Sequence, residues 1–130
     1  MAEPFIFVNT YTIKPGKADG YWKKFRQVAD LVQAKEPRML YFGGHANEDG
    51  STATTVQVHA DADNMLFHLE LVGEHIRQAA EDLDFSTMSV QIYGSPTEAV
   101  MEHIRELAGF GIRVSVNPAV TAFHRFTESE

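Results

Sequence analysis

The sequence contains no cysteine among its 130 residues. Disulfide bonds, thiolate nucleophiles and cysteine-ligated zinc sites are therefore excluded. A chain without disulfides agrees with a reducing compartment, so we expect a cytoplasmic protein. No apolar run reaches the roughly 18 residues of a membrane-spanning helix, and the first residues lack the basic and apolar regions of a secretory signal. We therefore expect no membrane partner.

Basic residues are scarce, with 11 Lys and Arg against 18 Asp and Glu and a formal net charge of −7. This balance argues against nucleic acid as a partner, because the phosphates would be repelled. The sequence also lacks the glycine-rich phosphate-binding motifs and the G-x-S-x-G motif of serine hydrolases. Hydrophobic residues make up 44% of the chain, which is enough for a core. We expect one domain over residues 1–130.

The clearest helical pattern runs from Asp63 to Leu83, where apolar residues recur with the period of a helix that packs one face on a core. His68 and His75 are seven residues apart, so both lie on the same side, at the edge of the apolar stripe. An imidazole there could act as a general base or as a hydrogen-bond donor. Alternatively, both histidines only pack. Their separation of about two turns, ~10.5 Å of rise, is too long for one metal ion, so we expect no metal site.

The remaining pattern predicts alternating strands and helices. Strands are expected at 5–13, 38–46, 51–59 and 86–93, helices at 17–35 and 95–108, and short β-like pieces at 112–116 and 120–126. Ser95 fits the cap of a capping box, because Pro96 follows it at the first helical position and Glu98 lies three residues on. Asp61 or Asp63 can cap the helix expected between Asp63 and Leu83.

The order β-α-β-β-α-β predicts an α+β, ferredoxin-like fold, in which two helices cover one face of a four-stranded antiparallel sheet. Residues 95–130 would extend it by a helix and a strand. The uncovered sheet face would expose an apolar patch too large for a monomer, so we expect a homodimer.

An asparagine lies on the first strand, where Asn9 falls between Phe7 and Tyr11 on one face. A buried amide needs partners, so Asn9 either holds a substrate oxygen or makes a structural hydrogen bond. The residues that could bind an aromatic substrate are Phe7, Tyr11, Trp22, Phe25 and Val72. Trp22 and Phe25 would serve equally well as ordinary core residues of their helix.

The element order, the first-strand asparagine (FIFVNTYTI) and the histidine-bearing helix (MLFHLELVGEHI) resemble the antibiotic biosynthesis monooxygenase superfamily over about residues 5–93. The resemblance implies a dimeric α+β barrel and a cofactor-independent monooxygenase that oxidises a phenolic or other aromatic small molecule with O₂. Asn9 would orient the substrate, and His68 or His75 would take its proton.

The superfamily also contains haem-degrading enzymes, which use a strand-1 asparagine, a strand-3 tryptophan and a helix-2 histidine. The third strand here (TTVQVHAD) has no tryptophan, which disfavours haem as a cofactor. The alternative function is that of a non-catalytic, ligand-binding or stress-related dimer of the same fold.

Overall fold

The computed structural model describes residues 3–126, in which five strands alternate with three α-helices and one 3-10 turn. In chain order they are β1 (Phe5–Ile13), α1 (Ala18–Lys35), β2 (Met39–Ala46), β3 (Thr52–His59), α2 (Asp63–Ala79), η1 (Ala80–Asp82), β4 (Leu83–Tyr93), α3 (Glu98–Gly109) and β5 (Arg113–Asn117). The expected order of strands and helices is confirmed.

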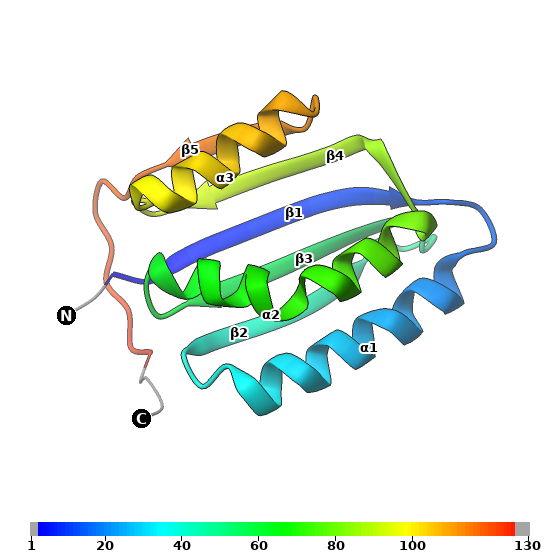
Figure 1. Cartoon of the computed structure of the whole chain (residues 1–130), viewed down its shortest axis with the longest axis horizontal. Helices are drawn as coiled ribbons and strands as arrows, with labels where there is room; N and C mark the ends of the chain where they lie inside the picture. The colour runs from blue at the N-terminus through cyan, green and yellow to red at the C-terminus, as the bar shows by residue number, and fades with distance from the viewer. Residues whose placement is uncertain (1–2, 127–130) are drawn as a thin grey trace.

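The strands form one sheet in the order β2-β3-β1-β4-β5, with β1 at its centre. The first four strands are antiparallel to their neighbours, whereas β5 runs parallel to β4 after the crossover through α3. Figure 1 shows α1, α2 and α3 on the same face of this sheet. The structure therefore has the expected α+β, ferredoxin-like architecture, extended by a helix and a parallel edge strand.

Alternate residues of β1 point toward the helices, as the two-residue period of a strand requires. Phe5 and Phe7 enter a core cluster that also holds Val100 and Ile104 of α3, while Tyr11 and Ile13 enter a second cluster beneath α1. Asn9 lies on the same strand face, between the two clusters. The polar residue therefore marks the place where the core divides.

Several boundaries differ from the sequence prediction, including the start of β4, which was expected at residue 86 and lies at Leu83. The second helix was expected to reach Leu83, but α2 ends at Ala79 and Leu83 already pairs with Ile13 in the sheet. The Lys14 N–H donates to the Asp82 carbonyl (2.9 Å), so the chain from Asp82 onward pairs with β1 and does not continue the helix. The β-like piece expected at 120–126 is wrong, because the described chain forms no strand after β5.

The start of α3 also differs. Ser95 was expected to cap this helix, but the cap is Thr97, whose Oγ1 accepts from the Val100 N–H at 3.3 Å. The helix begins at Glu98, so Pro96 precedes it and cannot occupy its first position. Gly94, which precedes both hydroxyl residues, has a φ of 132° that favours glycine.

We expect the Thr97→Ala substitution to lower the free energy of unfolding by about 1 kcal/mol, because it leaves an N–H group of the first helical turn without its partner. The matched control is Ser95→Ala, which removes the hydroxyl of an exposed residue outside the helix. Urea denaturation of both variants measures the difference. A loss in the Ser95 variant that equals the loss in the Thr97 variant would contradict this assignment.

Candidate active site

A cavity of about 110 Å³ lies where the core divides, between the sheet and helices α1 and α2. Its walls are mostly apolar, and they carry a few polar side chains. The polar lining residues are Asn9, Tyr11, Tyr21, Lys24, Thr55, Gln57, His68 and His75. A cavity of ~150 Å³ holds benzene, so this one is somewhat smaller than the space that one aromatic ring fills. An apolar pocket with a few converging polar groups is typical of a small-molecule site.

A buried carboxylate–imidazole pair stands at the cavity. His68 Nδ1 lies 2.6 Å from Glu36 Oε2, and the two side chains are 3% and 0% exposed. A carboxylate accepts a hydrogen bond, so Nδ1 carries a proton. In the neutral imidazole, Nε2 is then the unprotonated nitrogen. Within residues 3–126 it has no hydrogen-bond partner, and His68 borders the cavity. The pair therefore offers a basic nitrogen to a ligand.

The way in which α1 ends explains why the Glu36 side chain is buried. Glu36 is the C-cap of α1, and Pro37 prevents the helix from continuing. The turn directs the carboxylate toward α2, across 32 residues of sequence. Its second oxygen, Oε1, is buried and has no partner among the described residues. Buried carboxylates are rarely left in this state unless they have a role beyond stability.

Two further polar atoms at the cavity lack partners. Asn9 Oδ1 and His75 Nδ1 are buried without a hydrogen bond inside residues 3–126, and both residues line the cavity. An unsatisfied buried polar group costs free energy, which a ligand with a matching group can recover. Asn9 and His75 are therefore poised to contact a ligand that has hydroxyl or carbonyl groups.

Three hydroxyl groups form another part of the wall. The Tyr11 hydroxyl lies 3.0 Å from the Thr55 hydroxyl and also contacts the Tyr21 hydroxyl. Burial raises the pKa of Tyr11 and of Tyr21 above the ordinary value, despite the hydrogen bonds from Thr55. Both phenols therefore remain protonated near neutral pH, so they can position a ligand but cannot act as bases.

Aromatic rings close the side of the cavity next to His68. Phe42 stacks on Phe25 with ring centroids 5.2 Å apart and lies 5.5 Å from the His68 ring. Trp22 packs behind this wall against Gly44, where an added Cβ would lie only 2.6 Å from the indole. Gly44 is thus required for the close approach of α1 to β2.

The structure gathers most of the residues expected at the site. Six of them line the cavity, namely Asn9, Tyr11, Phe25, His68, Val72 and His75. Phe7 and Trp22, expected to bind substrate, do not line it. Phe7 belongs to the core cluster beneath α3, and Trp22 is taken up by the contact between α1 and β2. Burial alone could not distinguish a core aromatic from a cavity aromatic.

The sequence prediction missed five polar residues of the site, which are Tyr21, Lys24, Glu36, Thr55 and Gln57. No local pattern singles out Glu36, because the contact that brings it to His68 is tertiary. Thr55 and Gln57 carry a usable signal, because they alternate onto the helix-covered face of β3, and both are buried. Polar residues on the inner face of a strand indicate a site or a structural network.

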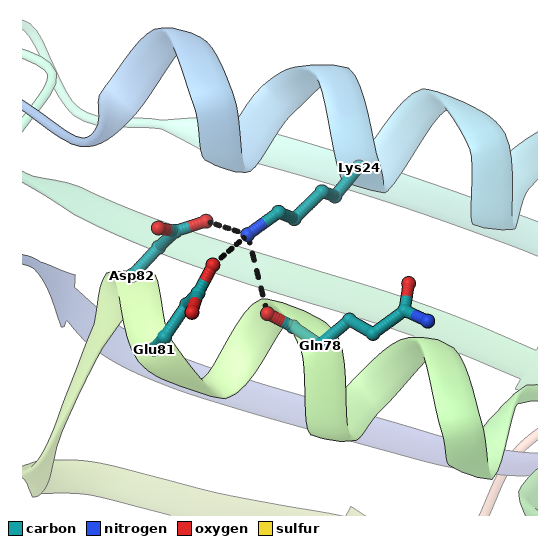
Figure 2. Close-up of polar contacts among 4 residues, drawn as sticks. All are labelled: Lys24, Gln78, Glu81 and Asp82. Carbon is teal, nitrogen blue, oxygen red and sulfur yellow. Dashed lines mark hydrogen bonds and ion pairs between the residues drawn. The ribbon is translucent and has the colours of Figure 1, made fainter.

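Lys24 connects α1 to the end of α2 at the edge of the cavity (Figure 2). Its Nζ donates to the Gln78 carbonyl (3.2 Å), to Glu81 (2.8 Å) and to Asp82 (2.9 Å). The hydrogen bonds that Lys24 donates to Glu81 and Asp82 raise its pKa. The cation therefore holds the two helices together where they flank the site.

Residues 3–126 contain no cluster of three or more His, Asp or Glu side chains that could hold a metal ion. No helix in the same part of the chain is both long and apolar enough to cross a membrane.

No protein-family model and no curated protein matches the chain. Solved structures do. MupZ from Pseudomonas fluorescens superposes with a TM-score of 0.73 at 20% identity, covering 95% of both chains. SnoaB from Streptomyces nogalater, a cofactor-independent oxygenase, gives 0.60 at 18% identity over 74% of this chain and 96% of its own. A Caulobacter crescentus protein provisionally assigned as an antibiotic biosynthesis monooxygenase superposes with a TM-score of 0.63 at 17% identity. The match covers 70% of this chain and 88% of that protein.

These likenesses show the fold. The expected antibiotic biosynthesis monooxygenase-like fold is confirmed. The MupZ match leaves about 5% of the chain uncovered, too little to omit all of α3, so the extension after β4 is also shared with a solved structure.

Proposed function

We propose that this chain, which has the fold of the antibiotic biosynthesis monooxygenase superfamily, is a cofactor-independent monooxygenase of a phenolic or similar aromatic small molecule. The observation that carries the proposal is the buried Glu36–His68 pair beside an apolar cavity. Burying an ionisable pair costs free energy that well-packed apolar residues would not. Such a pair at a ligand-sized cavity is better explained by proton transfer than by stability.

The chemistry begins with removal of a proton. Glu36 holds the Nδ1–H of His68, so Nε2 can accept the proton of a phenol in the cavity, and Glu36 stabilises the imidazolium that forms. The phenolate is electron-rich enough to pass an electron to O₂. Conversion of a phenol to a quinone consumes one O₂, places one oxygen atom in the new carbonyl and releases the other as water. The substrate is the only reductant, so no cofactor is needed.

The walls suggest how the substrate is held. Phe25 and Phe42 offer flat apolar surfaces, and Asn9 offers a buried acceptor to a substrate hydroxyl. The volume of about 110 Å³ is close to that of a single ring and no larger, so a polycyclic substrate would insert its reacting ring and keep the rest at the mouth. SnoaB, which has the same fold, is a cofactor-independent oxygenase, and this likeness supports the proposal of a reaction without haem.

O₂ uptake by metal-free protein with a panel of mono- and polycyclic phenols tests the function. We expect His68→Gln to lower kcat by about 10²–10⁴-fold, the contribution of a positioned general base. The control is His45→Gln, which changes an exposed histidine of β2 that does not line the cavity.

Phenols that raise the melting temperature without O₂ uptake would instead indicate the non-catalytic, ligand-binding alternative. Equal activity of the His68 variant and the wild type would remove His68 from the mechanism.

We also propose that the protein is a homodimer. The sheet face opposite the helices carries half-buried apolar and threonine side chains, which are Ile6, Val8, Thr10, Thr54 and Val56. A second copy could cover this face through a two-fold contact.

Light scattering after size-exclusion chromatography measures the mass directly. A dimer is expected for the wild type and a monomer for Val8→Lys/Val56→Lys, because two cations on the face oppose its burial. The control Glu102→Lys changes an exposed residue of α3 and leaves the mass unchanged. A monomeric wild type would refute the proposal.

A further inference from the structure

Gln57 is a buried amide at the cavity whose two ends have different surroundings. Its Oε1 lies 2.9 Å from His59 Nε2. Its amide nitrogen has no hydrogen-bond partner within residues 3–126. This nitrogen is not completely enclosed by protein atoms. Since Gln57 lines the cavity, the amide N–H groups are available to a ligand there.

The residues behind Gln57 determine which end faces the ligand. Asn64 Nδ2 lies 2.9 Å from His59 Nδ1, and an amide nitrogen can only donate. His59 Nδ1 is then the acceptor, and the proton is on Nε2, from which it is donated to Gln57 Oε1. Both contacts require the same tautomer. The oxygen of Gln57 is thereby occupied, and its NH₂ group is left for the cavity.

His59 is suited to keep this arrangement. It is fully buried, and desolvation, together with the neighbouring His68, lowers its pKa to about 3. The ring is therefore neutral near pH 7 and has one donor and one acceptor. A protonated ring would donate on both sides and would oppose the Asn64 contact. The two hydrogen bonds therefore have a single direction, in which Asn64 donates to His59 and His59 donates to Gln57.

We infer that Gln57 is an oxyanion-binding residue, whose amide N–H groups hold the oxygen of a bound phenolate or enolate, and that His59 and Asn64 are positioning residues that act through it. The assignment rests on the proposed function for the substrate class. Fixed donors aimed at a developing negative charge favour its formation, because they need no reorganisation during the reaction. His68 takes the proton, and Gln57 binds the oxygen that loses it.

The first test requires no ligand. Long-range ¹H–¹⁵N correlation NMR of the labelled protein at neutral pH distinguishes the two neutral tautomers of His59. We expect the Nε2–H form, assigned by the loss of its signals in His59→Gln. The Nδ1–H form would overturn the inference, because the Gln57 amide would then donate to His59 and turn its carbonyl to the cavity.

The second test uses p-nitrophenol, a single-ring ligand whose phenol and phenolate forms absorb at different wavelengths. We expect the wild type to bind the phenolate, and Gln57→Glu, which replaces the NH₂ by an oxygen, to weaken this binding at least about tenfold, the worth of a hydrogen bond to a charged group. p-Nitroanisole, which cannot ionise, should bind to both proteins within about twofold.

Equal weakening of the two ligands, or no phenolate binding by the wild type, would overturn the inference. If Gln57→Glu fails to fold, Gln57→Met removes the donor while retaining the volume, and the same selective loss is expected. Binding needs no turnover. Selective phenolate binding without O₂ uptake by any phenol would reject the oxygenase and retain the Gln57 assignment.

Discussion

Replacing His68 with leucine is expected to lower the free energy of unfolding by about 3–5 kcal/mol, the cost of leaving a buried charge without its partner. Glu36 is fully buried, and its Oε2 meets His68 Nδ1 at 2.6 Å. Its other oxygen is already without a partner among residues 3–126, so no second described group replaces the lost contact. Chemical denaturation monitored by circular dichroism measures the loss.

The double variant Glu36→Met/His68→Leu should recover most of this stability, because apolar residues of similar size can replace a buried pair at little cost. The double-mutant cycle then gives a coupling at or above the upper end of the 0.5–3 kcal/mol range of contacting residues.

Glu74 and Arg77 provide the matched control pair on the same helix. Their side chains are 64% and 72% exposed, and they also form an ion pair. Exposed pairs couple by about 0.2–1 kcal/mol, because solvent screens them. Similar coupling energies for the two pairs would show that Glu36 is not held as a buried carboxylate by His68, and the catalytic role proposed for the pair would lose its basis.

The same pair shows where prediction from sequence reaches its limit. The strand at 5–13 was predicted with its observed bounds, because alternation and the Lys14-Pro15-Gly16 stop are local signals. The helical period placed His68 and His75 on one side of α2, but it could not rank them. Only the packing of α1 against α2 makes His68 the buried partner of Glu36.

Other features of the site are also tertiary. Gln57 and His59 were recognisable as polar residues on β3, but the direction of their hydrogen bonds depends on Asn64, which lies on α2. The parallel pairing of β5 with β4 depends on the crossover through α3. Local patterns thus predicted most elements, whereas contacts between elements built the site.

His59 leads to the second large effect, which is a loss of stability in acid. Its pKa is about 3 in the folded protein and near 6.5 in the unfolded chain. The stabilisation is fully present above pH ~6.5 and falls as pH decreases. In that range His59 binds a proton in the unfolded state but not in the folded state. The slope is about 1.4 kcal/mol per pH unit, and the total approaches about 4–5 kcal/mol near pH 3.

Carboxyl groups also titrate in this range, so the measurement must isolate one histidine. The titratable neighbours of the His59 ring act in opposite directions, because His68 lowers its pKa and Asp61 raises it, and burial has the largest effect. His59→Gln retains a polar side chain but cannot take up the proton. Urea denaturation of both proteins between pH 7 and pH 4 gives the difference in stability.

We expect the stability advantage of the wild type over His59→Gln to shrink steadily below pH ~6.5 and to stay constant above it. Parallel curves would mean that His59 protonates equally in both states, and a ring that does so would also donate from Nδ1 and disturb the contact with Asn64. The pH dependence and the tautomer of His59 are therefore two consequences of one neutral, buried ring. Because that ring orients Gln57, protonation of His59 in the folded protein should weaken its affinity for the phenolate form of a ligand.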